Sequence, residues 1–77
     1  MNKQRRKRLQ EAVAAIESAM EIIEEVKEQE EEAFENLPES FQEGERGELM
    51  QEAIDCMDEQ LSCLEDAVVS LQELTEG

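Results

Sequence analysis

Residues 36–48 read NLPESFQEGERGE, and this stretch decides the fold because it interrupts two long helical patterns. Pro38 disfavours helical geometry at Leu37, and Gly44 and Gly47 permit a turn. We expect part of this stretch, residues 38–43, to form one short helical turn with the side chain of Phe41 folded inward. The chain on either side of the break should therefore form two separate helices.

Both flanking segments carry apolar residues at alternating steps of three and four, the a and d positions of a heptad repeat. The first row is Leu9, Val13, Ile16, Met20, Ile23, Phe34 and Leu37, and the second row is Met50, Ile54, Met57, Leu61, Leu64, Val68 and Leu71. Lys27 and Glu30 interrupt the first row. If the helices pair in opposite directions, Lys27 lies near Asp55, which is its expected ion-pair partner.

The simplest fold with two such rows is all-α, an antiparallel two-helix hairpin that resembles a coiled coil. We expect residues 1–77 to form this single helical-hairpin domain. The first helix should cover about residues 3–36 and the second about residues 46–75, with the turn over about residues 37–45.

Further apolar residues lie beside both rows. They are Ala12, Ala15, Ala19, Ile22 and Val26 in the first helix, and Leu49, Ala53, Cys56, Cys63, Ala67 and Leu74 in the second. The apolar arc covers about half of the helix circumference, which is more than one partner helix covers. We therefore expect the hairpins to assemble into a homo-oligomeric helical bundle, and the arc is compatible with a dimer, a tetramer or a hexamer.

The two cysteines lie seven residues apart on the second helix. This spacing separates Cys56 and Cys63 by about 10.5 Å, too far for a disulfide within one chain. The simplest interpretation is two small, half-buried residues, in line with the usual burial of free cysteine.

The composition argues against several classes of protein. The chain has no His, and its net charge is −15. Without His, the usual zinc and copper sites and His-based acid–base chemistry are absent, and no DxDxDG-type calcium loop is present. No apolar run of about eighteen residues is available to span a membrane. We expect a cytoplasmic protein that is not an enzyme and uses no cofactor or metal.

Acidic residues form a continuous stripe along the first helix. The stripe consists of Glu17, Glu21, Glu24, Glu28, Glu31 and Glu35. Three interpretations remain open: a solvated outer face, a mimic of the nucleic-acid backbone, or an oxygen-rich metal site. The mimic is the sharpest hypothesis, because such a stripe would bind a basic host nucleic-acid-binding protein.

Cations are concentrated at the start of the chain. Five of the seven are Lys3, Arg5, Arg6, Lys7 and Arg8, whereas the 69 residues after Arg8 carry two cations and 22 carboxylates. In the hairpin, residues 3–8 face residues 72–77, where Glu73, Glu76 and the chain terminus would neutralise only part of the cluster.

Cations at a helix start are unfavourable for the helix itself, but with the free backbone amides they form an anion site. A compact ligand such as a nucleotide or cyclic dinucleotide fits better than a long nucleic acid, which the acidic remainder of the chain repels. The other interpretation is a basic tail that only increases solubility.

Three segments resemble short phage and prophage proteins that carry two acidic helices. They are NKQRRKRL at residues 2–9, EEAFENLPES at residues 31–40 and ERGE at residues 45–48. The resemblance spans nearly the whole chain, and its central segment is more specific than the helices. It implies a phage accessory gene with a counter-defence role in an infected bacterium, and it transfers no functional residue.

Three functions follow, in order of preference. The first is non-catalytic sequestration of a phosphate-bearing, cyclic nucleotide immune signal at the basic helix starts of an oligomer, bound by Lys3, Arg5, Arg6, Lys7 and Arg8. The second, only slightly behind, is an acidic decoy that inhibits a host nuclease or CRISPR effector through the six-residue glutamate stripe. The third is a structural coiled-coil scaffold without a ligand.

Overall fold

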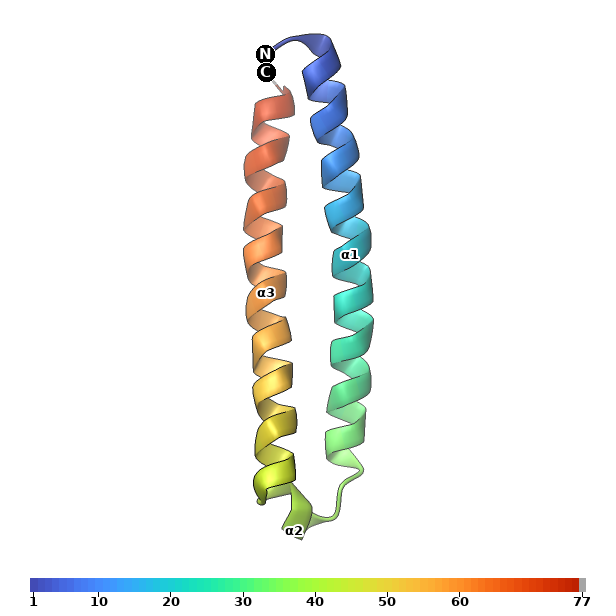
Figure 1. Ribbon diagram of the computed structural model, residues 1–77, viewed down its shortest axis with the longest axis vertical. Helices are drawn as coiled ribbons and strands as arrows, with labels where there is room; N and C mark the ends of the chain where they lie inside the picture. Colours follow the sequence, from blue (N-terminus) through green and yellow to red (C-terminus); the bar gives the residue numbers. More distant parts are fainter. Residues whose placement is uncertain (77) are drawn as a thin grey trace.

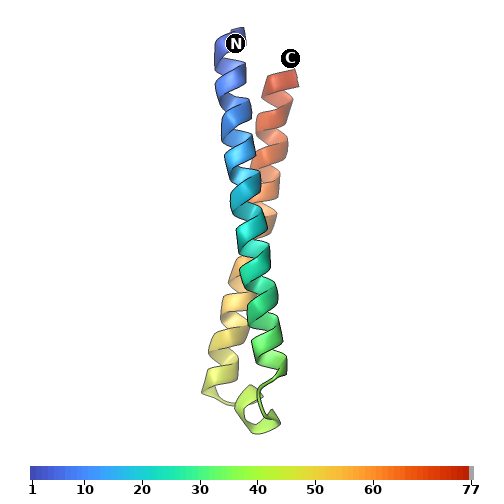
Figure 2. The ribbon, with the colours of Figure 1, turned by 90° about the vertical axis from the view of Figure 1, so that its right-hand side faces the viewer.

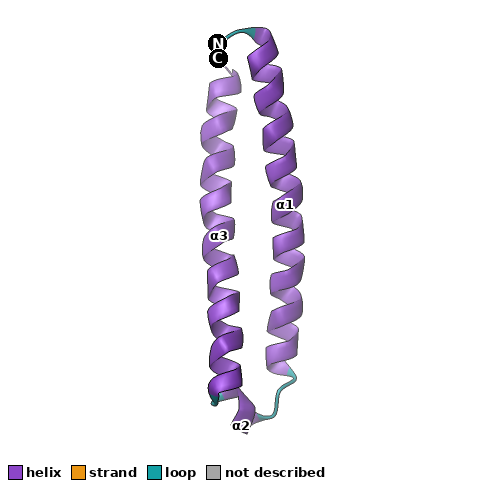
Figure 3. Ribbon diagram, in the orientation of Figure 1, coloured by secondary structure: helices purple, strands orange, loops and turns teal. Residues whose placement is uncertain are grey.

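The structure, a computed structural model, describes residues 1–76 and confirms that the chain is helical and elongated. It contains α1 (Lys3–Glu35), the one-turn helix α2 (Glu39–Gln42) and α3 (Glu45–Glu76), and the described residues include no strand (Figures 1 and 3). The Cα atoms extend over 58 × 14 × 13 Å. Helices α1 and α3 run side by side in opposite directions and cross at a shallow angle (Figure 2).

The two apolar rows meet along the seam between α1 and α3. Every residue of both rows is buried or half-buried, and Lys27 and Glu30 occupy half-buried positions within the first row. The buried apolar residues are Val13, Ile54 and Val68, and no side chain among residues 1–76 is fully buried. The core is therefore a single thin seam.

The connection between the long helices is held by one glutamine and one glycine. The side-chain amide of Gln42 donates hydrogen bonds to the backbone carbonyls of Phe34 and Leu37, both at 3.1 Å. The Phe34 carbonyl also accepts from the backbone N–H of Leu37, so Gln42 adds to the backbone bonds at the end of α1 and supplies a donor to Leu37. A Cβ atom on Gly47 would collide with the carbonyl oxygen of Gln42, so the backbones approach too closely there for any side chain.

The expectation that Phe41 folds inward is wrong. Its side chain is 52 % exposed, whereas the neighbouring Gln42 is half-buried. Successive residues of a one-turn helix point in different directions, and the inward direction is taken by the glutamine that caps α1.

The register between the long helices differs from the expected one. Lys27 pairs with Asp58, three residues beyond the expected Asp55, and a shallow groove brings Gln10 and Val13 together with Gln72, Thr75 and Glu76. Residues 10–13, rather than residues 3–8, therefore lie opposite the end of α3. The start of α1 projects past that end, as Figure 1 shows.

No helix within residues 1–76 has both the length and the apolar character needed to cross a bilayer.

Candidate functional site

The heptad positions separate the two sides of the helix pair. We count Val13 and Ile54 as position a of their helices. Glu17 and Glu24 of α1 and Glu65 of α3 are then at position e, and all three line one shallow groove. The e positions of both helices therefore lie on the same side of the seam, as expected for antiparallel helices, and the g positions lie on the opposite side.

The first of these sides is acidic. The acidic face comprises the predicted glutamate stripe of α1 and the two acidic residues at e positions of α3. Its members are Glu17, Glu21, Glu24, Glu28, Glu31, Glu35, Asp58 and Glu65. All of these residues are exposed except Glu31, which is half-buried. The acidic residues follow a pair of long helices, so the spacing of their Cα atoms is set by helix geometry rather than by flexible loops.

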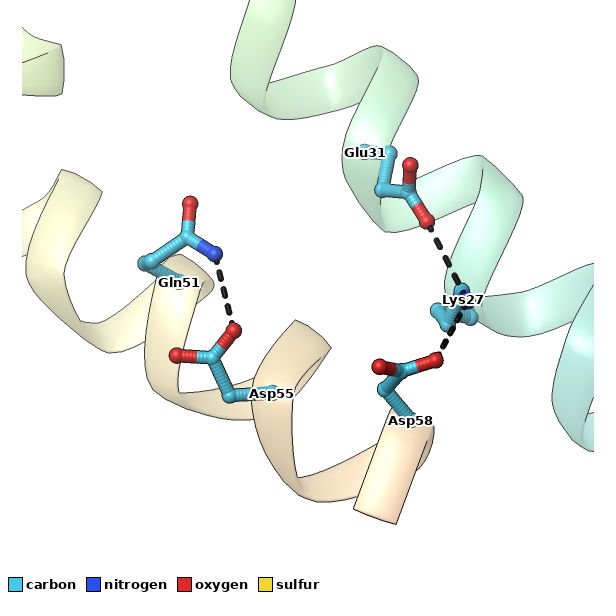
Figure 4. A network of polar contacts seen from close by, with 5 residues as sticks. All are labelled: Lys27, Glu31, Gln51, Asp55 and Asp58. Atoms are coloured by element: carbon cyan, nitrogen blue, oxygen red, sulfur yellow. Dashed lines mark hydrogen bonds and ion pairs between the residues drawn. The ribbon is translucent and has the colours of Figure 1, made fainter. Parts of the chain in front are cut away.

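One cation lies on the acidic face. The Nζ atom of Lys27 donates a hydrogen bond to Oδ1 of Asp58 at 2.9 Å and is 3.8 Å from Oε1 of Glu31 (Figure 4). The hydrogen bond to Asp58 is the main cause that raises the pKa of Lys27 above its usual 10.5. The expected partner, Asp55, instead accepts a hydrogen bond from the side-chain amide of Gln51 at 3.0 Å. Asp55 is at position b, farther from the seam than the e-position Asp58.

The opposite side of the helix pair is apolar. The apolar face comprises the g and c positions of both long helices between residues 12 and 74. Its apolar members are Ala12, Ala15, Ala19, Ile22, Val26, Ala33, Leu49, Ala53, Cys56, Cys63, Ala67 and Leu74. The larger members are well exposed, with Ile22 at 62 % and Leu49 at 60 %. Cys56 and Cys63 are also exposed, so the expectation of half-buried cysteines is wrong. At position c they point away from α1 and gain no cover from it.

The basic segment, residues 3–8, forms the first turns of α1. Asn2 caps this helix by accepting a hydrogen bond from the backbone N–H of Arg5 at 2.8 Å. Within the described residues 1–76, the one ion pair made by the segment joins Arg8 to Glu11 at 3.8 Å, and both side chains are well exposed. The Nε atom of Arg6, which points toward the seam, is buried without a hydrogen-bond partner.

Of the three expected partners, Glu73 and Glu76 make no ion pair with this segment, and the chain terminus at residue 77 lies outside the described residues. The shifted register explains this result, since residues 3–7 lie beyond the last turn of α3. The structure thus brings the five predicted ligand-binding cations together at one projecting end, and it places the six predicted partner-binding glutamates along one side.

The role of Gln42 was not predicted from the sequence. A glutamine just before two glycines is a weak signal, because its function depends on three carbonyl groups that only the folded turn brings near it: those of Phe34, Leu37 and, at 3.5 Å, Glu35. In the part of the chain that the structure describes, no group of three acidic or cysteine side chains is arranged to hold a metal ion.

Comparisons of the chain with protein-family models, with curated proteins and with solved structures found no match. Functional arguments therefore rest on the geometry and charge of the chain itself.

Proposed function

We propose that the protein is a non-catalytic counter-defence protein of phage origin whose acidic face occupies the nucleic-acid groove of a basic host protein, such as a nuclease or CRISPR effector. One observation carries this proposal: exposed carboxylates follow one side of both long helices, and a single lysine lies among them. Carboxylates on a rigid rod present a fixed array of negative charge, as a nucleic-acid backbone does. Their field also accelerates encounter with a basic partner.

The test is inhibition. A panel of purified bacterial nucleases and CRISPR effectors, each bound to labelled duplex DNA, is titrated with the protein, and displacement of the DNA is followed by fluorescence anisotropy. We expect displacement from at least one panel member, with weaker competition as salt screens the charges.

The matched variants separate the acidic face from net charge. Glu17→Gln, Glu21→Gln and Glu28→Gln together remove three charges from this face. Glu52→Gln, Glu59→Gln and Asp66→Asn remove three exposed charges from the outer edge of α3. We expect the first triple variant to lose at least tenfold in competition and the second to lose little. Equal losses would mean that total charge acts rather than the acidic face, which would contradict the proposal.

A second candidate, which the sequence ranks slightly first, is sequestration of a compact phosphate-bearing nucleotide at the basic segment. It is favoured by the absence of any ion-pair partner for Lys3, Arg5, Arg6 and Lys7 among residues 1–76, and by their projection beyond α3. Five cations at one helix start require a counter-charge, and a phosphate group matches the fork of an arginine side chain.

Native mass spectrometry with a panel of cyclic and linear nucleotides tests this candidate. Retention of one nucleotide per basic cluster, lost in the Arg5→Ala, Arg6→Ala double variant and kept in Arg46→Ala, would replace the decoy with the nucleotide-binding function. A protein that binds no nucleotide in the panel would remove this candidate.

A further inference from the structure

The apolar face has an unusual distribution of charge. Between residues 12 and 74 its g and c positions hold no charged residue apart from Arg46, and none of the 22 carboxylates of the chain occupies a g or c position in either helix. Gln29, Gln60 and Ser70 are polar members of this side. Where the same two positions continue to the ends of the molecule, they carry three arginines, Arg5 and Arg8 at one end and Arg46 at the other.

The helix pair needs cover on this side. Its own seam buries three apolar side chains, whereas Ile22, Leu49 and Leu74 remain more than half exposed on the apolar face. A chain of 77 residues with so thin a core gains much of its stability from association. The apolar members of this face run from Leu49 to Leu74 along α3, a length of about 38 Å at 1.5 Å per residue, and such exposed apolar side chains are the ones that the core of an interface buries.

We infer that the apolar face binds a second copy of this chain, face to face and with the two molecules antiparallel, to form a four-helix bundle. The interface is isologous, so α1 packs against the partner's α1 and α3 against the partner's α3. The inference goes beyond the proposed function, which requires only that the acidic face stays exposed. In this dimer the acidic faces of both copies point outward.

Charge complementarity selects the antiparallel orientation. Arg5 and Arg8 lie on the same side as the apolar face at the open end, and the loop end of each molecule carries Glu39, Glu43 and Glu45 against one cation, Arg46, so the two ends have opposite net charge. An antiparallel pair places each basic end beside the partner's acidic loop. A parallel pair would place two basic ends together and two acidic loops together, and both contacts would be repulsive.

If the ends of the two molecules are aligned, the register of the dimer is also fixed. The two-fold axis then crosses α1 between Ile22 and Val26 and crosses α3 near Gln60, roughly midway between Cys56 and Cys63. At about 1.5 Å per residue, Arg5 and Arg8 lie about 24–29 Å from this axis, and the partner's Glu45 lies about 22 Å from it on the same side. The basic segment therefore reaches the height of the partner's loop.

Two matched variants test the face. Val26→Glu adds a carboxylate to the apolar face, and Val69→Glu adds one at a valine of similar exposure, 49 % against 45 %, that lines the acidic groove. We expect sedimentation equilibrium to give a dimer for the native chain, a dimer about 100-fold weaker or more for Val26→Glu, and little change for Val69→Glu. A monomeric native chain at high micromolar concentration, or equal weakening by both variants, would overturn the inference.

Charge reversal tests the orientation. The Arg5→Glu, Arg8→Glu double variant should weaken an antiparallel dimer by about tenfold or more, because it places acids beside the partner's acidic loop. The same change would tighten a parallel dimer. Acids at a helix start stabilise that helix, and the Arg8–Glu11 pair that the change removes is well exposed and contributes little, so a weaker dimer could not be attributed to a damaged α1. A tighter dimer would overturn the antiparallel arrangement.

The native cysteines give an independent measurement. Oxidation with copper phenanthroline, which accepts two electrons while two protons leave the thiols, should link Cys56 of one copy to Cys63 of the other. Either single variant, Cys56→Ser or Cys63→Ser, should then abolish the covalent dimer. A covalent dimer that persists in one of these variants requires like cysteines to meet and would contradict this register.

Discussion

The loop end and the open end of the helix pair are held in different ways. At the loop end, the Gln42 amide caps α1 and Gly47 permits backbone contact, so the geometry leaves few alternatives for the residues there. At the open end, α1 projects past α3 with an exposed cap and an exposed ion pair. The comparison teaches that this chain fixes its fold at the turn and leaves the other end free to interact.

The largest effect should come from filling the close contact at the loop end. Gly47→Ala places a Cβ atom against backbone atoms of Gln42, so α2 must move away from α3. We expect a loss of about 1–3 kcal/mol in the free energy of unfolding, measured by urea denaturation at fixed protein concentration. Gly44→Ala is the control, because its Cβ would meet its nearest neighbour at an ordinary 3.5 Å. Equal effects of the two variants would argue against the close packing of α2 on α3.

The next effect concerns the cap on α1. Gln42→Ala removes the side-chain donor to the carbonyls of Phe34 and Leu37, of which Phe34 keeps its bond from the N–H of Leu37. We expect a loss of about 1–2 kcal/mol in the same measurement. Gln42→Glu keeps the size but removes the donor and adds a negative charge at the C-terminus of α1, so it should destabilise at least as much. A neutral result for both variants would mean that water replaces the cap at no cost.

A smaller loss is expected at the open end. Asn2→Ala removes the acceptor for the N–H of Arg5, and N-caps contribute about 1 kcal/mol, less where the helix start makes few other contacts. Asn2→Asp keeps an acceptor and should retain stability. If Asn2→Ala destabilises the chain more than Gln42→Ala, the ranking of the two ends is reversed.

The smallest effect is a change in the pH dependence of stability. It involves the Lys27–Asp58 ion pair, which lies between the two ends of the molecule. Lys27 has a raised pKa in the folded chain because of its bond to Asp58. Its contribution to stability is fully present below the unfolded-state pKa of about 10.4 and is lost as the pH rises through the higher folded-state pKa. Asp58→Asn should flatten this alkaline decrease in thermal unfolding scans, whereas Asp55→Asn should leave it unchanged.

The heptad rows were sufficient to predict the helical fold and the residues of the seam. Val13, Ile54 and Val68 are buried because an α-helix repeats its faces every three to four residues, a property that the sequence shows directly. The glutamate stripe could be placed on one side of α1 by the same rule. These features depend on local periodicity alone.

The remaining errors involve the turn. The short helical turn was expected, but the register of antiparallel helices depends on how that turn packs against them, and Lys27 pairs with Asp58 rather than Asp55. The same shift left the basic segment without Glu73 and Glu76 opposite it. Phe41 was expected to point inward because it is hydrophobic. The inward position is taken instead by Gln42, whose amide donates to carbonyls at the end of α1. Each of these cases depends on how the turn brings the two long helices together, which the periodicity of the sequence does not show.

The capped turn also has a kinetic consequence. The Gln42 bond to Phe34 joins residues only eight positions apart, so it forms without closing a long loop. Each further layer of the seam can then be added to the one before it, from the turn toward the open end, a route that favours fast folding. The last layer to close in this order is also the first to open, so amide hydrogens near the basic segment should exchange with solvent sooner than those beside the turn.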